Sequence, residues 1–482
     1  MLDFDKGMTP KPLVPNSATR IEHFDTIDGK LRPFRTLISS PNNQGVATTA
    51  LALSNFELLN DVIYGVGVDW ATPANGAIYS WDTSGFQWFT KLGFGAASVP
   101  NAMLHAHAGF LFGLRNSRYI YKMTTGGAYT ASFHDTGAAF VNGFSDPITH
   151  SKDGKCYIPF DNKIYSIDST GVTPALALTL PNANFLIKSI CEEGNFINIC
   201  GYDVTSGVSS ALLWDRDTSV TDLTESYQLG VEQVYHSATL GGITFFVMLR
   251  KDVTNTNFQE KPVLVIKYIN GNKAEIAGEF PVTSFANTGH YIGGKYTSND
   301  RLYFTGLVKF DGESAARNIV FVLDKNGTLK IAQNASINTG TLLVTGLIRN
   351  GEGFWLGAGS DGAWNTTTTY TTISSYETSD IRSPDLSLAL QFGEGFVTCE
   401  PLPASGQIIV KARKNEETTF TTIETFTGTN RMKFKISPLK AVNALTGIDN
   451  ARLVRFRLES TVGATITGFQ ADFNYVPDKN NG

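Results

Sequence analysis

Short apolar runs alternate with turn-forming residues along most of this chain. Runs such as VIYGVGV (62–68), FINICGY (196–202) and RLYFTGL (301–307) have the length and composition of buried strands. A turn follows each run, and then come strand-like segments with a period of two. Strands recur regularly, with no amphipathic helix between them. The pattern predicts an all-β fold.

One strand-and-turn unit recurs. IYSWDTSG (78–85) is matched almost position for position by IYSIDSTG (164–171), and IVFVLDKNG (319–327) is a third copy. Looser copies give a spacing of about 45 residues, which is the repeat length of a β-propeller blade. We count seven units, the last over Phe354–Tyr376, and predict an about seven-bladed β-propeller over residues 51–383.

The stretch from Ile78 to Phe89 permits two interpretations. Ser80-Trp81-Asp82, followed by a glycine and an aromatic residue, is close to the aspartate box of sialidase-type propellers. Recurrence favours a hairpin turn instead, in which the aspartate accepts a backbone hydrogen bond and the glycine takes a positive φ. Three copies in one chain cannot all be one active site.

The first 50 residues are rich in proline and weakly periodic, so we predict an extended N-terminal segment. FDTIDGKLRPFRTL (24–37) predicts a short hairpin with Asp28-Gly29 as its turn. We expect this segment to dock on a neighbour or to supply the strand that closes the ring, because an open ring leaves an unpaired edge.

The repeat stops near Ser383-Pro384, and longer alternating strands follow. They predict a β-sandwich over residues 384–477, with 478–482 as a short tail. Several basic residues at alternating positions are expected to share one face: Lys433, Lys435, Arg452, Arg455 and Arg457. Three alternatives stay open for that face: a solvated surface, a patch that docks on an acidic neighbour, or a contact with DNA.

The amount of charge and its distribution along the chain indicate what kind of partner the protein has. Charged residues make up 17% of the chain and the net charge is −5. This charged fraction is below the ~25% usual for soluble domains and suits a surface that neighbouring subunits cover. Both ends are slightly basic and the middle is acidic, which suggests two parts with different partners.

Cysteine spacing and hydropathy indicate the compartment. The four cysteines, at 156, 191, 200 and 399, form no metal-finger pattern, so we expect free buried thiols. Neither a signal peptide nor a membrane-spanning run is expected, and synthesis is expected in the cytoplasm.

Candidate chemistry is sparse. His105 and His107 lie on one face of a predicted strand and offer a weak metal-site pattern, and Asp215–Asp222 offers an incomplete calcium loop. No sequence motif of a catalytic nucleophile or phosphate loop is present. We therefore expect no cofactor, no bound metal and no enzymatic activity.

The layout resembles the tail hub or nozzle proteins of short-tailed bacteriophages. The sequence similarity to that family is found at Asp28, Gly29, Leu31, Arg32 and Phe34, in the strand near the N-terminus that enters the fold. It also lies in the last two strands, RLVRFRL (452–458) and ATITGFQ (464–470). None of these residues forms a catalytic motif.

The resemblance implies a structural virion protein of the tail. Its partners would be other copies of itself in a ring, the portal or adaptor, and fibre or spike proteins, with DNA passing through without sequence-specific binding. The N-terminal residues above and the five C-terminal basic residues would then serve assembly or docking. The alternative is a carbohydrate-binding or glycoside-cleaving propeller, for which the candidate aromatics are Trp70, Trp88, Trp214 and Trp364.

Overall fold

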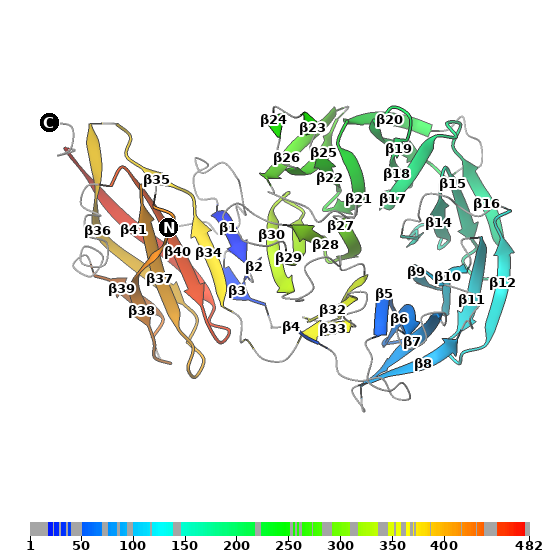
Figure 1. The fold of residues 1–482 in the computed structure, drawn as a ribbon, viewed down its shortest axis with the longest axis horizontal. Helices are drawn as coiled ribbons and strands as arrows, with labels where there is room; N and C mark the ends of the chain where they lie inside the picture. Colours follow the sequence, from blue (N-terminus) through cyan, green and yellow to red (C-terminus); the bar gives the residue numbers. More distant parts are fainter. Residues whose placement is uncertain are drawn as a thin grey trace.

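The computed structural model is built of β-strands (Figure 1). It describes residues 18–22, 24–27, 30–34, 37–39, 51–69, 76–83, 87–93, 100–115, 118–137, 146–216, 223–250, 254–255, 258–259, 263–271, 273–281, 292–308, 317–335, 346–350, 353–357, 363–366, 370, 373–385, 387–415, 417–429, 431–437 and 451–477. These ranges contain no helix, as the alternating pattern predicts. None of them therefore forms a helix with the length and apolarity that crossing a bilayer requires.

Antiparallel four-stranded sheets follow one another along the chain. The first three are β5 (Leu51–Leu59), β6 (Val62–Asp69), β7 (Gly76–Asp82) and β8 (Gln87–Gly93); β9 (Pro100–His107), β10 (Phe110–Arg115), β11 (Tyr119–Thr124) and β12 (Tyr129–Asp135); and β13 (Ile148–Thr149), β14 (Cys156–Phe160), β15 (Lys163–Ile167) and β16 (Pro174–Thr179).

Two further sheets have the same form. They are β17 (Phe185–Glu193), β18 (Phe196–Asp203), β19 (Ser209–Trp214) and β20 (Leu223–Gly230); and β21 (Gln233–Leu240), β22 (Ile243–Arg250), β25 (Val263–Asn270) and β26 (Lys273–Pro281). A small hairpin of β23 (Thr254–Asn255) and β24 (Phe258–Gln259) lies between β22 and β25.

Two more groups of four strands complete the series. β27 (Ile292–Ser298), β28 (Arg301–Val308), β29 (Arg317–Asp324) and β30 (Leu329–Ala335) form one end of a ten-stranded sheet. β31 (Gly346–Asn350), β32 (Gly353–Gly357) and β33 (Ala363–Thr366) are joined by β4 (Leu37–Ser39), which pairs with β33 and supplies the fourth strand from the N-terminal segment.

These sheets pack side by side in a ring. The first strands of successive sheets touch, as β5 touches β9 and β17 touches β21, and β31 touches β5. Shared apolar cores lie between neighbouring sheets, one of them lined by Phe112 and Ile158. Figure 1 shows β8, β12, β16 and β20 on the outside of the ring. A ring of four-stranded antiparallel sheets is the arrangement of a β-propeller.

Hairpin turns account for the recurrent aspartate. The Asp324 carboxylate accepts hydrogen bonds from the backbone N–H groups of Asn326 (2.9 Å) and Thr328 (3.1 Å), and Gly327 has a φ of 75°. Asp168 accepts from the N–H of Val172 (2.8 Å) in the same way. The turn interpretation of this motif is confirmed at both positions.

The N-terminal strands belong to both parts of the chain. β1 (Ala18–Glu22) pairs in parallel with β30 and antiparallel with β34 (Ser374–Thr378). β2 (Phe24–Ile27) and β3 (Lys30–Pro33) form the hairpin expected there, and β3 pairs with β41 (Ile466–Pro477). The hairpin itself therefore does not complete the ring, which is the role of β4.

One predicted boundary is wrong. The sequence repeat predicts a last unit that runs to Tyr376, but β34, which contains that residue, pairs with β1 and β40. The reason is that β4 already occupies the free edge of β33, so the following strand is left to pair elsewhere.

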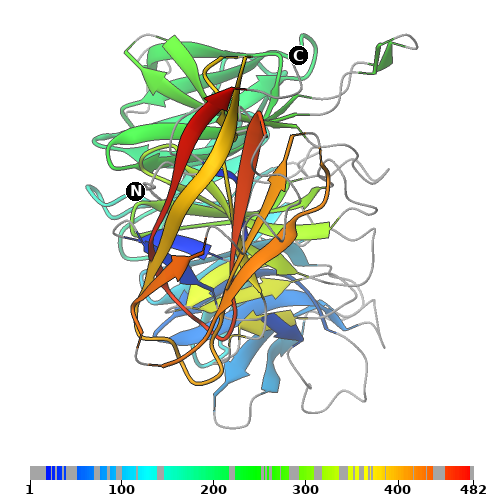
Figure 2. The same ribbon diagram turned by 90° about the vertical axis from the view of Figure 1, so that its left-hand side faces the viewer.

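Two sheets make up the C-terminal part (Figure 2). In the first, the ten-stranded sheet continues from β34 into β40 (Leu453–Ser460), β37 (Ile408–Lys414) and β38 (Thr421–Phe426), with β35 (Ile381–Arg382) on β40. The second has the order β2, β3, β41, β36 (Leu388–Cys399) and β39 (Lys433–Ile436).

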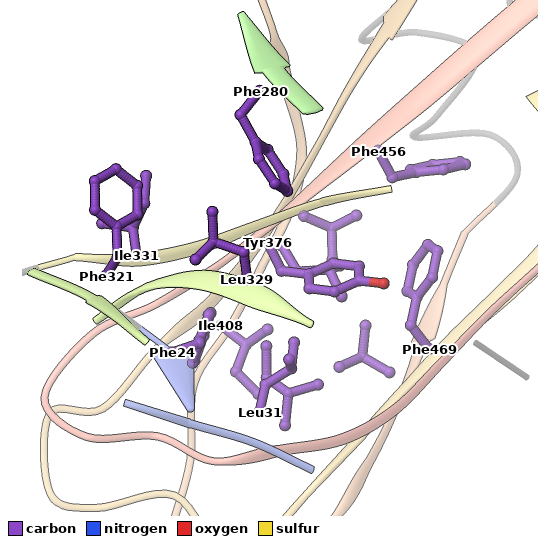
Figure 3. Packing of buried hydrophobic residues seen from close by; sticks show 14 of the residues in the cluster. Phe24, Leu31, Phe280, Phe321, Leu329, Ile331, Tyr376, Ile408, Phe456 and Phe469 are labelled. Carbon is purple, nitrogen blue, oxygen red and sulfur yellow. The ribbon is translucent and has the colours of Figure 1, made fainter. Parts of the chain in front are cut away.

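A single core joins these sheets to the ring. Figure 3 shows Phe24 and Leu31 of the N-terminal hairpin with Tyr376, Phe456 and Phe469 of the C-terminal strands. All five are at most 2% exposed. The same cluster includes apolar side chains of β26, β29 and β30, so burying this core ties the hairpin, the ring and the C-terminal sheets together.

Candidate docking residues and the polar centre of the ring

The N-terminal residues predicted to dock are engaged within the chain. Leu31 is fully buried, and Phe34, 7% exposed, lies 5.9 Å from the ring of Phe354. The Lys30 ammonium lies 2.9 Å from the Glu400 carboxylate, and Arg32 lies 3.8 Å from it. Asp28 and Gly29 lie outside the described residues. Within the described part, Arg32 is the predicted docking residue here whose side chain stays substantially exposed, at 45%.

Two of the C-terminal arginines are neutralised by acidic residues just after the ring. The Arg455 guanidinium donates from Nε to the Asp380 carboxylate (2.7 Å), and Arg457 lies 2.5 Å from Glu377. The carboxylates are 4% and 8% exposed, so these pairs are largely shielded from water. Arg457 also lies 3.9 Å from Glu459. These charges therefore hold β40 against the segment around β34.

The expectation that several of the basic residues share one face is wrong for the two lysines. Lys433 and Lys435 lie on β39, in the five-stranded sheet, whereas Arg455 and Arg457 lie on β40 in the other sheet. Alternation places residues on one face only within a strand or between paired strands. Arg452 precedes β40 and is exposed.

The lysine pair is the more accessible part of this group. The Lys433 ammonium lies 4.2 Å from the centre of the Phe396 ring, and Lys435 forms an ion pair of 2.8 Å with Glu394. Both members of that ion pair are about half exposed, at 58% and 44%, so it contributes little to stability.

His105 and His107 both form hydrogen bonds with Thr149 of the next sheet. The Thr149 hydroxyl lies 3.0 Å from His105 Nε2 and 3.3 Å from His107 Nδ1. His107 Nε2 lies 2.7 Å from the Asp168 carbonyl oxygen, so Nε2–H donates and Nδ1 accepts from Thr149. His105 Nδ1 lies 3.4 Å from the Glu57 carboxylate. Across the described ranges no three His, Cys, Asp or Glu side chains are grouped to hold a metal ion.

A lysine connects three inner strands at the ring's centre. The Lys295 ammonium of β27 donates to Ser189 Oγ (2.7 Å) and to the Ile190 carbonyl (3.3 Å) of β17. Ser237 Oγ of β21 donates to the same Ser189 oxygen (3.1 Å). A lysine beside two serines has the members of a nucleophile-and-base pair, but Ser189 is fully buried and cannot reach a substrate. These hydrogen bonds instead hold β17, β21 and β27 together.

No sequence motif singles out Lys295, Ser189 or Ser237. Register shifts in the three inner strands, between Ile187 and Ser189, Val234 and His236, and Ile292 and Lys295, bring the side chains together. A β-bulge adds one residue to a strand and redirects the side chains that follow. Three unrelated sequence positions give no pattern from which this could be read.

Burial at the ring's centre shifts several pKa values. Burial first, and then the positive charge of Lys295, lower the pKa of His236 to about 3, against the opposing hydrogen bond to the Gly293 carbonyl. Burial also raises the pKa of Asp146; the Glu57 carboxylate adds to this, while Lys295 and His105 oppose it. The centre of the ring thus contains charges of both signs in partly dry surroundings.

The tryptophans proposed for glycan contact serve as packing residues where they are described. Trp88 is 2% exposed and Trp214 is fully buried. Trp70 and the side chain of Trp364 lie outside the described residues. The four cysteines are free and buried, as expected.

Comparisons with known proteins assign no family. No family model matches the chain, and no curated protein matches it. Among solved structures, the computationally designed Ika8 protein is 12% identical, with a TM-score of 0.41, over 72% of this chain and 96% of that one. The Cps50 (Swd1) beta-propeller domain of Myceliophteria thermophila is 8% identical, with a TM-score of 0.44, over 69% and 99%. At these scores neither likeness bears on what the chain does.

Proposed function

We propose that this chain is a structural subunit of a bacteriophage tail, in the hub or nozzle ring that forms the DNA-ejection conduit. In this proposal the six four-stranded sheets and the strands β27–β30 are seven blades. The two C-terminal sheets, with β1–β3, are a β-sandwich that anchors fibres or spikes. The starting point is the resemblance in layout to tail hub proteins.

One structural observation supports the proposal above others. β1 lies between β30 of the ring and β34 of the C-terminal part, so one hydrogen-bonded sheet runs from one part into the other. Rotation of the two parts against each other would break backbone hydrogen bonds and expose the shared core. A subunit that transmits force between a conduit and its attached fibres needs this kind of rigid connection.

The polar residues support a role without catalysis. The repeated aspartates at 168 and 324 are used in turns, and the Lys295–Ser189 contact is closed to solvent. Arg455 and Arg457 are neutralised internally. These side chains are therefore committed to holding the subunit in one shape.

Partners of the subunit would be further copies of the chain, the portal or adaptor, and fibre or spike proteins. The described candidates for those contacts are Arg32, Lys433, Lys435 and Arg452, because these residues remain accessible. The acidic balance of residues 51–400 suits a conduit, since DNA binding depends on basic contacts to phosphate.

Density-gradient fractionation of the native source tests the proposal. Peptide mass spectrometry across the fractions should find this chain with DNA-filled particles, at a fixed ratio to a capsid protein. A soluble protein of the same source serves as the control for carry-over. Recovery of the chain only at the top of the gradient, with that control protein, would reject a virion role.

A further inference from the structure

An open pocket of about 500 Å³ lies where the first two sheets meet. Its walls come from the β5–β6 turn and the strands that flank it, from β7 and β8, and from the β11–β12 turn of the next sheet. The residues that matter for the argument are Asn60, Trp81, Asp82, Phe89, Lys91 and Thr125. Trp81 and Asp82 belong to the repeated turn motif. A looser copy has Trp214 before Asp215, but Trp214 is fully buried, whereas Trp81 is only half-buried.

The indole of Trp81 is held rigidly at this pocket. Its ring centre lies 4.5 Å from that of Trp355 and 5.3 Å from that of Trp88, with both pairs in edge-on geometry. These contacts cover part of the indole, so Trp81 is half-buried. The part that they leave uncovered lines the pocket. A fixed aromatic surface loses little conformational entropy on binding a flat apolar partner.

The polar wall is balanced in charge. Asp82 supplies a carboxylate, Lys91 an ammonium, Asn60 a carboxamide and Thr125 a hydroxyl. Asn60 sits in a tight hairpin turn with a φ of 50°, which fixes where its side chain starts. One negative and one positive group disfavour a polyanion. A purely apolar ligand would displace water from these groups without offering hydrogen bonds in return.

A sugar ring has the matching chemistry, because one face is apolar C–H and the edge is hydroxyl. We propose that this pocket binds a neutral saccharide unit of a glycan, stacked on Trp81 and hydrogen-bonded by Asn60, Asp82 and Lys91. The volume lies within the range of roughly 300–1,000 Å³ usual for small-ligand sites.

Binding, rather than cleavage, follows from the acidic groups. Asp82 is the single carboxylate among the described lining residues, whereas glycoside hydrolysis uses two at a set separation. The inference does not depend on the proposed tail role, since a rim pocket would serve a free glycan-binding protein equally well.

A glycan array carrying neutral and sialylated oligosaccharides, probed with the full chain, tests the proposal. Binding to neutral glycans is expected, and calorimetric titration with the strongest free oligosaccharide then gives the affinity. Asn60→Gly and Lys91→Ala should each weaken that affinity tenfold or more. Glycine accepts the positive φ of residue 60 and Lys91 is exposed, so both variants should fold.

Lys273→Ala is the matched control, because Lys273 is an exposed lysine on β26, the outer strand of another sheet, as Lys91 is on β8. It should bind as the unaltered chain does. Absence of binding to every neutral glycan, or affinity unchanged in both pocket variants, would overturn the proposal. Binding restricted to sialylated glycans would also overturn it. Each of these outcomes leaves the gradient experiment unaffected.

Discussion

Asp380→Asn tests whether the C-terminal arginines stabilise the fold. The Asp380 side chain is 4% exposed and accepts from Arg455 Nε at 2.7 Å, while its other oxygen lies 3.3 Å from Arg382. Arg413 lies near the same group of charges. Its own burial, and then the positive charge of Arg455, lower its pKa. Removing the carboxylate charge therefore leaves a group of shielded positive charges uncompensated.

We expect a large loss in the free energy of unfolding, although Asp380→Asn replaces only one carboxylate oxygen by an amide nitrogen. Removing one partner of a buried ion pair costs about 3–5 kcal/mol. Asparagine keeps one acceptor oxygen, and Arg382 is half exposed, so we expect the lower end, about 3 kcal/mol. The parts of this 482-residue chain share one core, so at an unfolding entropy of about 2.1 cal/mol/K per residue the loss corresponds to a fall of about 3 °C in Tm.

Calorimetry and urea unfolding of the purified chain measure this loss. Asp472→Asn is the control, because Asp472 is exposed and lies on β41 in the other sheet; its effect should stay within about 0.5 kcal/mol. The shift for Asp380→Asn should persist at high salt, since the pair is largely shielded. An unchanged Tm would refute this reasoning and return Arg455 to the list of docking candidates.

Three further predictions concern the core and the ring. Leu31→Ala should lower the free energy of unfolding in urea by about 2–5 kcal/mol, since the side chain is fully buried, whereas Leu176→Ala, at a residue 50% exposed, should have little effect. Gly201→Ala should sharply reduce the folded yield, because an added Cβ would lie 2.1 Å from the Leu186 carbonyl oxygen; Gly93→Ala, with open space around it, is the control for both yield and Tm. The folded-state pKa of His236, about 3, lies below its ordinary 6.5, so the unfolded chain takes up the proton first as pH falls. Stability should therefore decrease between those two values by about 1.4 kcal/mol per pH unit from this group, and His236→Gln should remove that part of the slope; identical slopes would contradict the shift.

Local chemistry was readable from the sequence, and long-range pairing was not. Asp324 and Gly327 specify their turn through groups a few residues apart, so the recurrent hairpins could be predicted. The strand containing Tyr376 alternates like its neighbours, and only competition with β4 for the edge of β33 decides its partner. Arg455 looked like a surface charge because its partner Asp380 lies 75 residues away.

The candidate sites show the same division. Trp81 and Asp82 were singled out by their motif, but the pocket that they line also needs Thr125 from the next sheet. Lys295 and Ser189 are 106 residues apart and meet only because bulges redirect both strands. Sequence periodicity contains no information on contacts between side chains that are so far apart along the chain.

The position of β4 has a consequence for how the chain is made. β4 (Leu37–Ser39) leaves the ribosome early, but its partner β33 (Ala363–Thr366) appears only after most of the chain has been synthesised. At roughly 5–20 residues per second, the strand waits for on the order of 20–60 s without its partner. Pairing of such distant segments is also slow in itself. The nascent ring therefore stays open during translation, and its unpaired edges would be exposed to other nascent copies in the same polysome.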